Sequence, residues 1–510
     1  MLHRQQFCIL RDRADLPGYK SIDLEDGWVL SYHEELPLFF DEPSQTALLG
    51  YAWQVMPGRE APEKELEKLA REGGGRISEK SLMDAEETWN GRYAVISGGR
   101  IYLDAGGMLN VFYSAAGASS DCLLLARAMG LSEKIYEPGR MNWMPGPRTH
   151  YEGISRLMPS QVYDLGTGTV HARELLPTAF VSGGSEQELT AAFIDHFCYS
   201  LRQMADLFPE HRLMAALTGG HDSRALTALA KKAGTDFMAY TMEYDGISKG
   251  DVEIPPQICA VLGLDHVYVR RNKSNYSAQR EKEYDRYTCG LVRDEDRLYY
   301  AYDQFRELTE AYGKCVLLRS GIWPDLCCVY SRFFEDGRPG QELFQEYHIG
   351  TGSPEWESLQ EYFSWCSRNP VKTPDPANRF YYEERSGCWL ASIENGFTMI
   401  DDIISLEPLN CRLLLSILAA YDEECRMSRR PQMMIADAAC PELAEIPYEN
   451  GRAYGESFLT SIRMKADRAL DRMRHMGFRR AASFYARTIR KHFRIWKDRR
   501  GRRQSDGQFR

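Results

Sequence analysis

The sequence lacks any long apolar run. No stretch of its 510 residues approaches the roughly 18 consecutive apolar residues that a membrane-spanning helix requires. The first residues, MLHRQQFCILRDR, contain a short apolar run that becomes charged too soon for a signal peptide. With 43% hydrophobic and 27% charged residues, the composition is typical of a soluble globular protein. We therefore expect a cytoplasmic protein, and its length suggests about three domains.

The cysteines lack the spacing of a metal or redox site. There are 13 of them, an odd number, and they are scattered without a CxxC pair or a Cys/His cluster. Because disulfide frameworks belong mainly to small secreted proteins, we expect reduced, buried thiols in place of disulfides or a zinc site.

Net positive charge is absent except at the end of the chain. Residues 460–510 hold 17 Lys and Arg against 4 Asp and Glu, a balance of +13, whereas the whole chain carries −10. Aromatic and aliphatic residues are interleaved with these arginines in a helical pattern, which predicts a basic amphipathic tail. Two partners fit it equally well: an anionic membrane surface, with which the protein would then associate, and an acidic protein face. A nucleic acid is the weaker candidate, because no independent RNA-binding module accompanies the tail.

What the sequence does contain is a strand, a glycine turn and a helix in direct succession. Residues 213–224 read LMAALTGGHDSR. The short apolar run suits a buried strand, and helical spacing resumes after the turn. Gly219 and Gly220 allow the backbone to come close to an anion, which the free N–H groups and dipole of a helix N-terminus favour.

The polar residues of the turn indicate phosphate held through a metal. Thr218 and Ser223 add hydroxyl donors. Asp222 would repel a bare phosphate, so its presence predicts a divalent cation between the two. The structural alternative is an ordinary strand-turn-helix unit that Asp222 caps.

This turn, TGGHDS at residues 218–223, resembles the pyrophosphate loop of the ATP pyrophosphatases, Ser/Thr-Gly-Gly-x-Asp-Ser, and its surroundings resemble the asparagine synthetase branch. Members cleave ATP between its α and β phosphates, so the resemblance implies ATP and Mg²⁺ as cofactors. It assigns no role to His221, which occupies the variable position. It implies that the loop and the end of the next strand bind the nucleotide through Leu217, Thr218, Gly219, Gly220, Asp222, Ser223, Thr241 and Met242.

A second segment, SGIWPDL at residues 320–326, lines up with the family's second signature, Ser-Gly-Glu-Gly-Ser/Ala-Asp-Glu. Asp325 follows a predicted strand and can share Mg²⁺ with Asp222, since two carboxylates and several waters suit that ion. Its alternative role is to cap the next helix. Ile322 departs from the family, whose members carry a substrate-engaging Glu or Tyr there, so the resemblance does not imply aspartate as the substrate. The residues that match the signature are Ser320, Gly321 and Asp325.

A third resemblance lies late in the chain. Residues 407–410, EPLN, resemble the family's Glu-x-R-x-P-F-L-D segment, and residues 426–443 resemble the stretch that holds its late catalytic lysine. Here no lysine lies between Lys372 and Lys465. An arginine can supply positive charge to an adenylate or pyrophosphate but cannot shuttle a proton at neutral pH. We assign this role to Arg426, with Asp222 and Asp325 as the other catalytic residues; the neighbours Arg429 and Arg430 are alternatives, and each is also a plausible surface charge.

The first 184 residues read as a β-rich domain. Short apolar or alternating runs are divided by Gly, Asp and Pro, and the pair Gly98 and Gly99 predicts a tight hairpin. Residues 89–113 and 145–159 resemble scaffold motifs of the N-terminal amidotransferase domain of asparagine synthetases. The resemblance implies an Ntn-type fold for this part of the chain.

The glutaminase chemistry of such a domain is missing. In active relatives a cysteine directly follows the initiator Met, and its own α-amino group acts as the base for the thiolate. Position 2 is Leu2, and Cys8 is internal and has no free amine. We therefore interpret this domain as a degenerate, structural copy.

The rest of the chain predicts an α/β fold. Short apolar runs at residues 213–218, 236–243, 266–270 and 314–320 alternate with helical stretches, which implies right-handed crossovers and a parallel sheet with ligands at the carboxyl ends of its strands. Residues 340–460 read as helical. The expected fold class is thus a β-rich amidotransferase-like domain followed by an adenine-nucleotide α-hydrolase-like synthetase domain with a helical C-terminal part.

The domain boundaries follow from a linker and a cap. A linker is expected at residues 178–184, and the Ser-x-x-Glu capping box of Ser185 and Glu188 opens an amphipathic helix. We place an amidotransferase-like domain at 1–184, the synthetase domain at 185–459 and the basic tail at 460–510.

These features predict an ATP-dependent amide ligase that forms AMP and pyrophosphate. A small-molecule or peptide carboxylate would be activated as an acyl-adenylate, and an amine or ammonia would open it. Two other readings stay open. One is an inactive pseudo-synthetase that binds nucleotide or a partner, favoured by Leu2, Ile322 and the missing lysine; the other is a pyrophosphate-loop enzyme acting on nucleic acid, favoured only by the tail.

The degenerate first domain predicts that the purified protein produces no glutamate from glutamine, with or without ATP. An unperturbed thiol near pKa 8.5 is only a few per cent thiolate at neutral pH, and Cys8 has lost the adjacent amine. Cys8→Ala should therefore change nothing in an amide-formation assay. Glutamate release that Cys8→Ala abolishes would show that a displaced nucleophile works after all.

Overall fold

The computed structural model describes residues 4–134, 143–176, 184–244, 247–271, 277–292, 298–327, 330–335, 337–371 and 375–449. Met1–Ile247 and Asp251–Glu449 belong to one compact unit. Leu2, most of the expected linker at 178–184 and the basic tail at 460–510 lie outside the described residues. The three domain boundaries therefore stay predictions.

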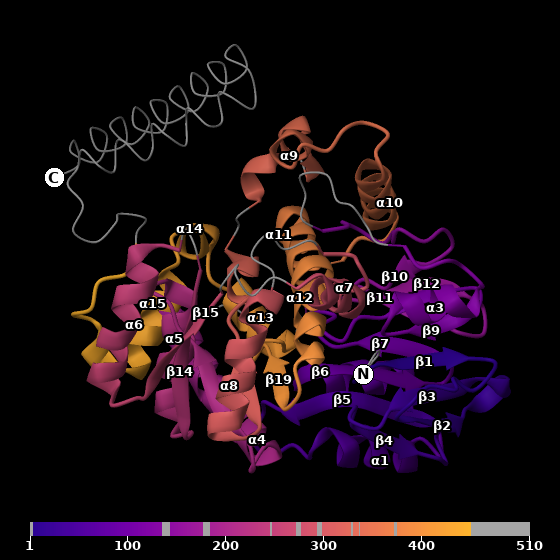
Figure 1. Ribbon diagram of the computed structural model, residues 1–510, viewed down its shortest axis with the longest axis horizontal. Coiled ribbons are helices and arrows are strands. Elements are labelled where there is room, and N and C mark those ends of the chain that lie inside the picture. The colour runs from indigo at the N-terminus through magenta and orange to yellow at the C-terminus, as the bar shows by residue number, and fades with distance from the viewer. Residues whose placement is uncertain are drawn as a thin grey trace. The chain divides into compact units, whose positions relative to one another are not determined.

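The N-terminal part consists of two antiparallel sheets of six strands each, drawn from indigo to purple in Figure 1. One has the order β10-β8-β9-β1-β3-β2 and the other β12-β11-β7-β6-β5-β4. The strands are β1 (Phe7–Leu10), β2 (Tyr19–Asp23), β3 (Val29–His33), β4 (Leu38–Asp41), β5 (Thr46–Gln54), β6 (Trp89–Ser97), β7 (Arg100–Leu103), β8 (Phe112–Ser114), β9 (Gly117–Ser119), β10 (Ser155–Arg156), β11 (Gln161–Asp164) and β12 (Thr169–Ala172).

Apolar side chains of both sheets share one core. Phe7 and Leu30 from the first sheet and Leu49 and Leu103 from the second belong to the same buried cluster. The predicted hairpin is confirmed, because Gly98 and Gly99 take φ of 57° and 73° between β6 and β7, a region that L side chains rarely adopt. Three helices cover outer faces of these sheets: α1 (Pro62–Glu72), α2 (Glu79–Glu86) and α3 (Cys122–Ala128).

The later part is built on a parallel sheet of five strands in the order β15-β14-β13-β16-β19. These are β13 (Arg212–Ala216), β14 (Phe237–Glu243), β15 (His266–Arg270), β16 (Cys315–Leu318) and β19 (Ile403–Leu406). The four strands predicted between residues 213 and 320 are confirmed. The expectation that residues 340–460 are all helical was wrong, because β19 lies there; its run IISL is too short to stand out next to helices.

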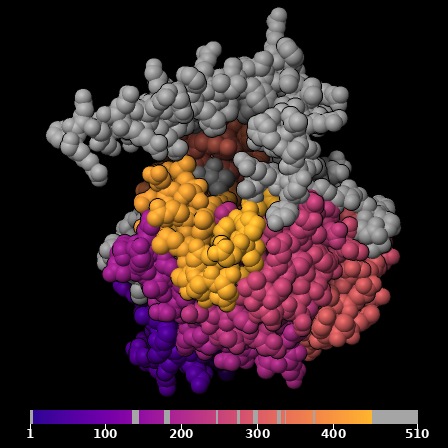
Figure 2. Space-filling view, turned by 90° about the vertical axis from the view of Figure 1, so that its left-hand side faces the viewer, coloured from indigo at the N-terminus to yellow at the C-terminus, as the bar shows by residue number. Residues whose placement is uncertain are grey.

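Helices cover both faces of this sheet. One buried cluster joins it to α4 (Glu186–Leu207), α5 (His221–Ala233), α6 (Lys249–Leu262), α13 (Arg412–Ala419) and α15 (Arg430–Ala439). A second cluster joins the opposite face to α7 (Ala278–Tyr287), α8 (Tyr302–Tyr312), α11 (Pro376–Tyr382) and α12 (Ala391–Gly396). The predicted capping box of Ser185 and Glu188 is present at the start of α4. On the face shown in Figure 2, orange and yellow residues lie beside magenta ones, in keeping with the packing of α15 on α4 and α5.

Shorter elements complete the later part. They are α9 (Gln341–Glu346), α10 (Pro354–Arg368), α14 (Glu423–Met427), a π-helical stretch (Glu383–Leu390), a ribbon of β17 (Phe334–Glu335) with β18 (Arg338–Pro339), and the 3₁₀ turns Glu25–Gly27, Leu298–Ala301, Trp323–Leu326, Ser331–Phe333, Phe397–Met399 and Pro441–Leu443. Within the described ranges, no helix combines the length and apolarity needed to cross a membrane.

One buried asparagine connects the N-terminal sheets to the parallel sheet. Asn410, four residues beyond β19, accepts a hydrogen bond from the Gly106 N–H at 2.7 Å. Its amide donates to the Gly91 carbonyl and, at 2.9 Å, to the Asp104 carboxylate. All its partners are part of the scaffold segment 89–113. The network fixes the start of α13 against the N-terminal part.

Replacing this asparagine should destabilise the whole unit. Asn410→Ala removes three buried hydrogen bonds, while the Asp104 carboxylate keeps four backbone N–H donors. We therefore expect a loss of about 2–4 kcal/mol in unfolding free energy, measured as a lower thermal midpoint. The half-buried Asn369 offers a matched control, since its amide donates to a single carbonyl, and Asn369→Ala should cost less. Equal effects of the two variants would contradict this role of Asn410.

Candidate functional site

The predicted phosphate loop lies where the central strand β13 meets helix α5. Gly220 is the residue before the helix, with φ of −75° and ψ of 176°. The loop closes on its own hydroxyls: the Thr218 N–H donates to Ser223 Oγ at 3.0 Å, and the Gly220 N–H donates to Thr218 Oγ1 at 3.2 Å. The predicted strand-turn-helix is confirmed. Thr218 and Ser223 thus shape the loop in this structure.

A residue that the sequence analysis missed also binds the loop. Asp251, in the first turn of α6, accepts a hydrogen bond from the Gly219 N–H at 3.0 Å. Burial raises the pKa of this carboxyl, as does the nearby Glu449, while the Gly219 N–H and the Thr218 hydroxyl lower it. The only sequence signal was an acidic residue early in the helix after β14, which is an ordinary helix feature.

The Asp222 carboxylate is paired with Arg429, the residue directly before α15. Arg429 Nη1 lies 3.0 Å from one carboxylate oxygen and 3.3 Å from the other, and Gln432 Nε2 donates to the same group at 3.1 Å. Burial raises the pKa of Asp222, whereas Arg429 and Gln432 lower it. The pair joins the loop to a helix more than two hundred residues away in sequence.

Arg429 reaches the loop because the chain turns sharply there. Its φ of 61° lies in the left-handed region, which is uncommon for a residue with a side chain, and α15 begins at the next residue. Arg430 instead pairs with Glu186, and Arg426 donates through Nε to the Tyr421 carbonyl at 3.0 Å. The structure therefore brings Arg429 to Asp222, whereas the catalytic role assigned to Arg426 stays a prediction.

The chain's last described residues close over the loop. His221 stacks on Tyr448, with ring centroids 4.3 Å apart and planes 7° from parallel. The Arg224 guanidinium carbon lies 3.7 Å from the centroid of the Tyr448 ring. The same guanidinium donates hydrogen bonds at 2.7 Å to the carbonyls of Ile446 and Pro447. Burial lowers the pKa of His221, so this imidazole is neutral at neutral pH. Its contacts are those of a packing residue, as expected.

The predicted adenine contacts lie on the strand next to the loop. The Thr241 hydroxyl donates to the Leu217 carbonyl at 2.8 Å, and the Leu217 N–H donates to the Tyr240 carbonyl at 2.8 Å. Thr241 and Leu217 are fully buried, while Met242 is half-buried. These bonds hold the two strand ends together. Adenine recognition by Thr241 and Met242 stays a prediction.

The second predicted segment follows β16, the neighbour of β13. The Gly321 N–H donates to both oxygens of Glu407, at 3.0 and 2.9 Å. A Cβ on Gly321 would lie 2.7 Å from this carboxylate and from Leu390, so any other residue here would force one of these two side chains to shift. Ile322 is fully buried in the core. Ser320 is half-buried beside it.

Asp325 lies in the 3₁₀ turn Trp323–Leu326, but its side chain lies outside the described residues. A Mg²⁺ site shared with Asp222 therefore stays a prediction.

Buried charges surround Glu407 at the carboxyl ends of β16 and β19. Burial and then the nearby Glu394 raise the pKa of Glu407 to about 8, although Arg319 and the N–H groups of Gly321 and Ile322 lower it. Glu394 lies 3.8 Å from Arg319. Sequence reasoning found only the EPLN segment here, because Arg319 and Glu394 carry no local pattern.

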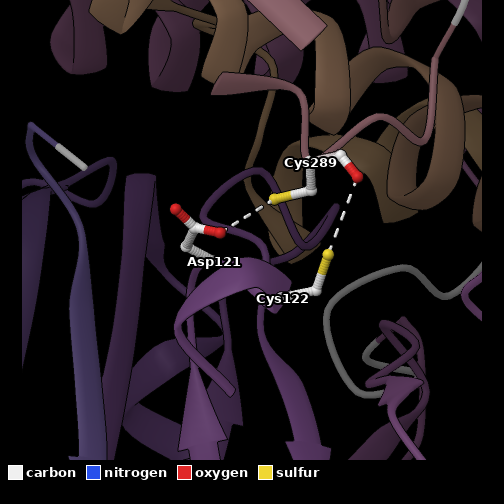
Figure 3. A group of neighbouring side chains, drawn as sticks. All are labelled: Asp121, Cys122 and Cys289. Atoms are coloured by element: carbon white, nitrogen blue, oxygen red, sulfur yellow. Dashed lines mark hydrogen bonds between the residues drawn. The ribbon is translucent and has the colours of Figure 1, made fainter. Parts of the chain in front are cut away.

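A separate group with ligand-type side chains lies at the N-terminal part. Asp121, Cys122 and Cys289 place their carboxylate and thiol atoms within 4.8 Å of one another, and all three are buried (Figure 3). Cys289 Sγ donates to the carboxylate at 3.4 Å, and Cys122 Sγ to the Cys289 carbonyl at 3.7 Å. The hydrogen bond with Cys122 and burial raise the pKa of Cys289. Cys289 is thus a protonated thiol. All described cysteines are free and, except for Cys366, buried, in line with the prediction of buried thiols.

No protein-family model matches this sequence, and no curated protein matches it. Part of the chain is structurally similar to solved synthetases at 12% sequence identity. The NMN synthetase from Francisella tularensis has a TM-score of 0.22 and covers 39% of this chain and 94% of its own. The NH3-dependent NAD synthetase from Campylobacter jejuni subsp. jejuni NCTC 11168 has a TM-score of 0.22 and covers 42% and 97%. The glutamine-dependent NAD+ synthetase from Acinetobacter baumannii, in complex with ADP, has a TM-score of 0.21 and covers 46% and 54%. Similarity at this level assigns no activity.

The buried Glu407 predicts a pH-dependent stability. Its pKa is raised from 4.5 to about 8, so between these values the folded chain holds a proton that the unfolded chain has lost. The free energy of unfolding therefore falls as pH rises through this window, on the order of a few kcal/mol, and levels off above it. Glu407→Gln removes this dependence.

Thermal midpoints across that pH window measure the effect. The thermal midpoint of Glu407→Gln should rise relative to that of the unmodified protein as pH rises. The exposed Glu310 serves as control, and Glu310→Gln should show a constant difference. A constant difference for Glu407→Gln as well would mean that this carboxyl titrates normally.

Proposed function

We propose that this protein is an ATP-dependent amide ligase of the asparagine synthetase type, which forms AMP and pyrophosphate. The observation that supports it most is the placement of the loop, residues 218–223. It leaves the carboxyl end of the central strand of a five-stranded parallel sheet and opens α5, the position at which α/β proteins bind phosphates. Asp222 and a basic side chain, Arg429, meet at this loop.

The proposed reaction has two steps. In the first, an oxygen of the substrate carboxylate attacks the α-phosphorus of ATP, the bond from the α-phosphorus to the bridging oxygen breaks, and pyrophosphate leaves. In the second, an amine nitrogen attacks the acyl carbon, its bond to the AMP oxygen breaks, and the amine loses a proton. Negative charge develops on the leaving group in both steps, so groups that stabilise anions at the loop accelerate them.

Asp222 fits a divalent cation. Carboxylate oxygens are preferred ligands of Mg²⁺, and those of Asp222 accept hydrogen bonds from two side chains, Arg429 and Gln432, which a bound cation would have to displace. Asp222, with Asp325 as a predicted second ligand, would hold the ion. When bound, Mg²⁺ neutralises charge on the departing pyrophosphate.

Arg429 has a defined place in this proposal. Its guanidinium is one-third exposed and is held by Asp222. If Asp222 binds the metal, Arg429 loses its partner and can turn to the phosphates, for which a guanidinium offers several donors. Arg429 thus takes the charge-stabilising role that the sequence analysis assigned to Arg426.

The nitrogen would arrive as ammonia or as an amine on a second substrate. Cys8 lies in β1 between β3 and β9 and is 1% exposed. Burial, aided by Asp121, raises the pKa of this thiol to about 12. A buried thiol with such a pKa is a poor nucleophile. This supports an enzyme without its own glutaminase activity.

A second candidate is a nucleotide-binding protein without catalysis. Ile322 is packed in the core where relatives carry a substrate-engaging residue, and loop N–H groups already have acceptors within the chain. Turnover distinguishes the two candidates. The carboxylate, the amine donor and any partner of the basic tail are expectations at this stage.

Asp222→Asn should reduce the formation of AMP and pyrophosphate by orders of magnitude while the thermal midpoint changes little, because the metal loses its anionic ligand. Product analysis after incubation with Mg·ATP and a panel of carboxylates and amines measures this. Arg429→Gln should also reduce the rate, on the order of a hundredfold, if its charge stabilises the phosphates.

Arg426→Gln is the matched control, because it removes an arginine three residues away that donates to a backbone carbonyl. It should have the smaller effect. Release of ADP and phosphate would exclude this class of reaction. Tight nucleotide binding that depends on Asp222, with no turnover under any condition, would favour the inactive alternative.

A further inference from the structure

The Gly219 N–H of the loop donates to an anionic side chain from outside the loop. The acceptors of the Thr218 and Gly220 N–H groups are hydroxyls of the loop itself. The acceptor of the Gly219 N–H is the carboxylate of Asp251, at 3.0 Å. Asp251 thus lies where a bound phosphate oxygen would be expected.

The Gly219 peptide is held from both sides. Its N–H donates to Asp251, and its carbonyl accepts a hydrogen bond from the Glu449 N–H at 2.8 Å. The two peptide groups that flank the Gly219 Cα are therefore each held by one hydrogen bond, and the Gly219 N–H is directed at a carboxylate. An incoming phosphate must compete with this carboxylate for the same donor.

The charges near Gly219 favour metal-complexed over metal-free polyphosphate. Asp251 and Asp222 come from different helices and flank one loop, and Glu449 adds a third carboxyl near Asp251. The cation beside them is Arg429, paired with Asp222. A free polyphosphate would meet repulsion from Asp251 as well as competition for the donor, whereas a metal-complexed one brings charge that offsets both.

We propose that Asp251 is a specificity-determining residue: its carboxylate occupies the phosphate position at the Gly219 N–H and so restricts the loop to metal-complexed polyphosphates. The inference rests on the proposed function, since it concerns the same phosphate site. It has a directional consequence. Removal of Asp251 increases the affinity for metal-free polyphosphate, whereas removal of a structural support would decrease it.

Calorimetric titration of the full-length chain with inorganic pyrophosphate, in the presence of a chelator and then with Mg²⁺, tests this. Asp251→Ala should bind metal-free pyrophosphate on the order of tenfold more tightly than the unmodified protein, because a charge-assisted competitor is lost. The gain should be smaller with Mg²⁺. Asp251→Asn, which keeps an acceptor but removes the charge, should lie between the two.

Asp265→Asn is the matched control. Asp265 is an exposed carboxylate directly before the amino end of β15, whereas the loop lies at the carboxyl ends of the strands, so this variant should bind as the unmodified protein does. Unchanged or weaker metal-free binding by both Asp251 variants overturns the inference and leaves the proposed function standing. If Asp251→Ala does not fold, the affinity of Asp251→Asn for metal-free pyrophosphate decides: tighter binding supports the inference, and unchanged or weaker binding overturns it. An absence of pyrophosphate binding in every variant overturns the inference together with the proposed function.

Discussion

The ion pair between Asp222 and Arg429 is the interaction on which the site depends. It ties the loop after β13 to the start of α15, so that residues far apart in sequence meet at one sheet edge. A second contact joins the loop to α6, because the Gly219 N–H donates to the Asp251 carboxylate. A metal-bound nucleotide would bring one positive and one negative group. The chain supplies its own counterpart of each, Arg429 for the metal and Asp251 for the phosphate.

This arrangement balances the charges of the site within the chain itself. A buried Asp222 without a cation would raise the cost of folding, because burial disfavours the charged carboxylate. Arg429 offsets that cost even though it must adopt a left-handed backbone conformation. On the neighbouring strand β16, the buried Glu407 carboxylate likewise has partners within the chain, because the Gly321 N–H donates to both of its oxygens. The carboxyl ends of the strands are thus stabilised by contacts within the chain, and the proposed function requires a ligand to replace those at the loop.

Local patterns predicted the parts of this structure that local physics determines. The glycine hairpin at Gly98, the cap at Ser185 and the turn before α5 each depend on a few consecutive residues, and all three are present. Other features escaped prediction because distant contacts create them, and two of them are instructive. The strand β19 is recognisable only beside β16, and the choice of Arg429 over its neighbours follows from a backbone turn that no spacing rule predicts.

Under the proposed function, the loop binds a metal-complexed nucleotide that replaces these internal partners. A structure of the full chain with Mg²⁺ and α,β-methylene-ATP, in which the bond to be broken is blocked, tests it most directly. We expect the triphosphate at residues 218–223, Asp222 on the metal, Arg429 turned toward the phosphates, and the Gly219 N–H on a phosphate oxygen in place of Asp251. A nucleotide bound elsewhere, with both internal contacts unchanged, would contradict the account.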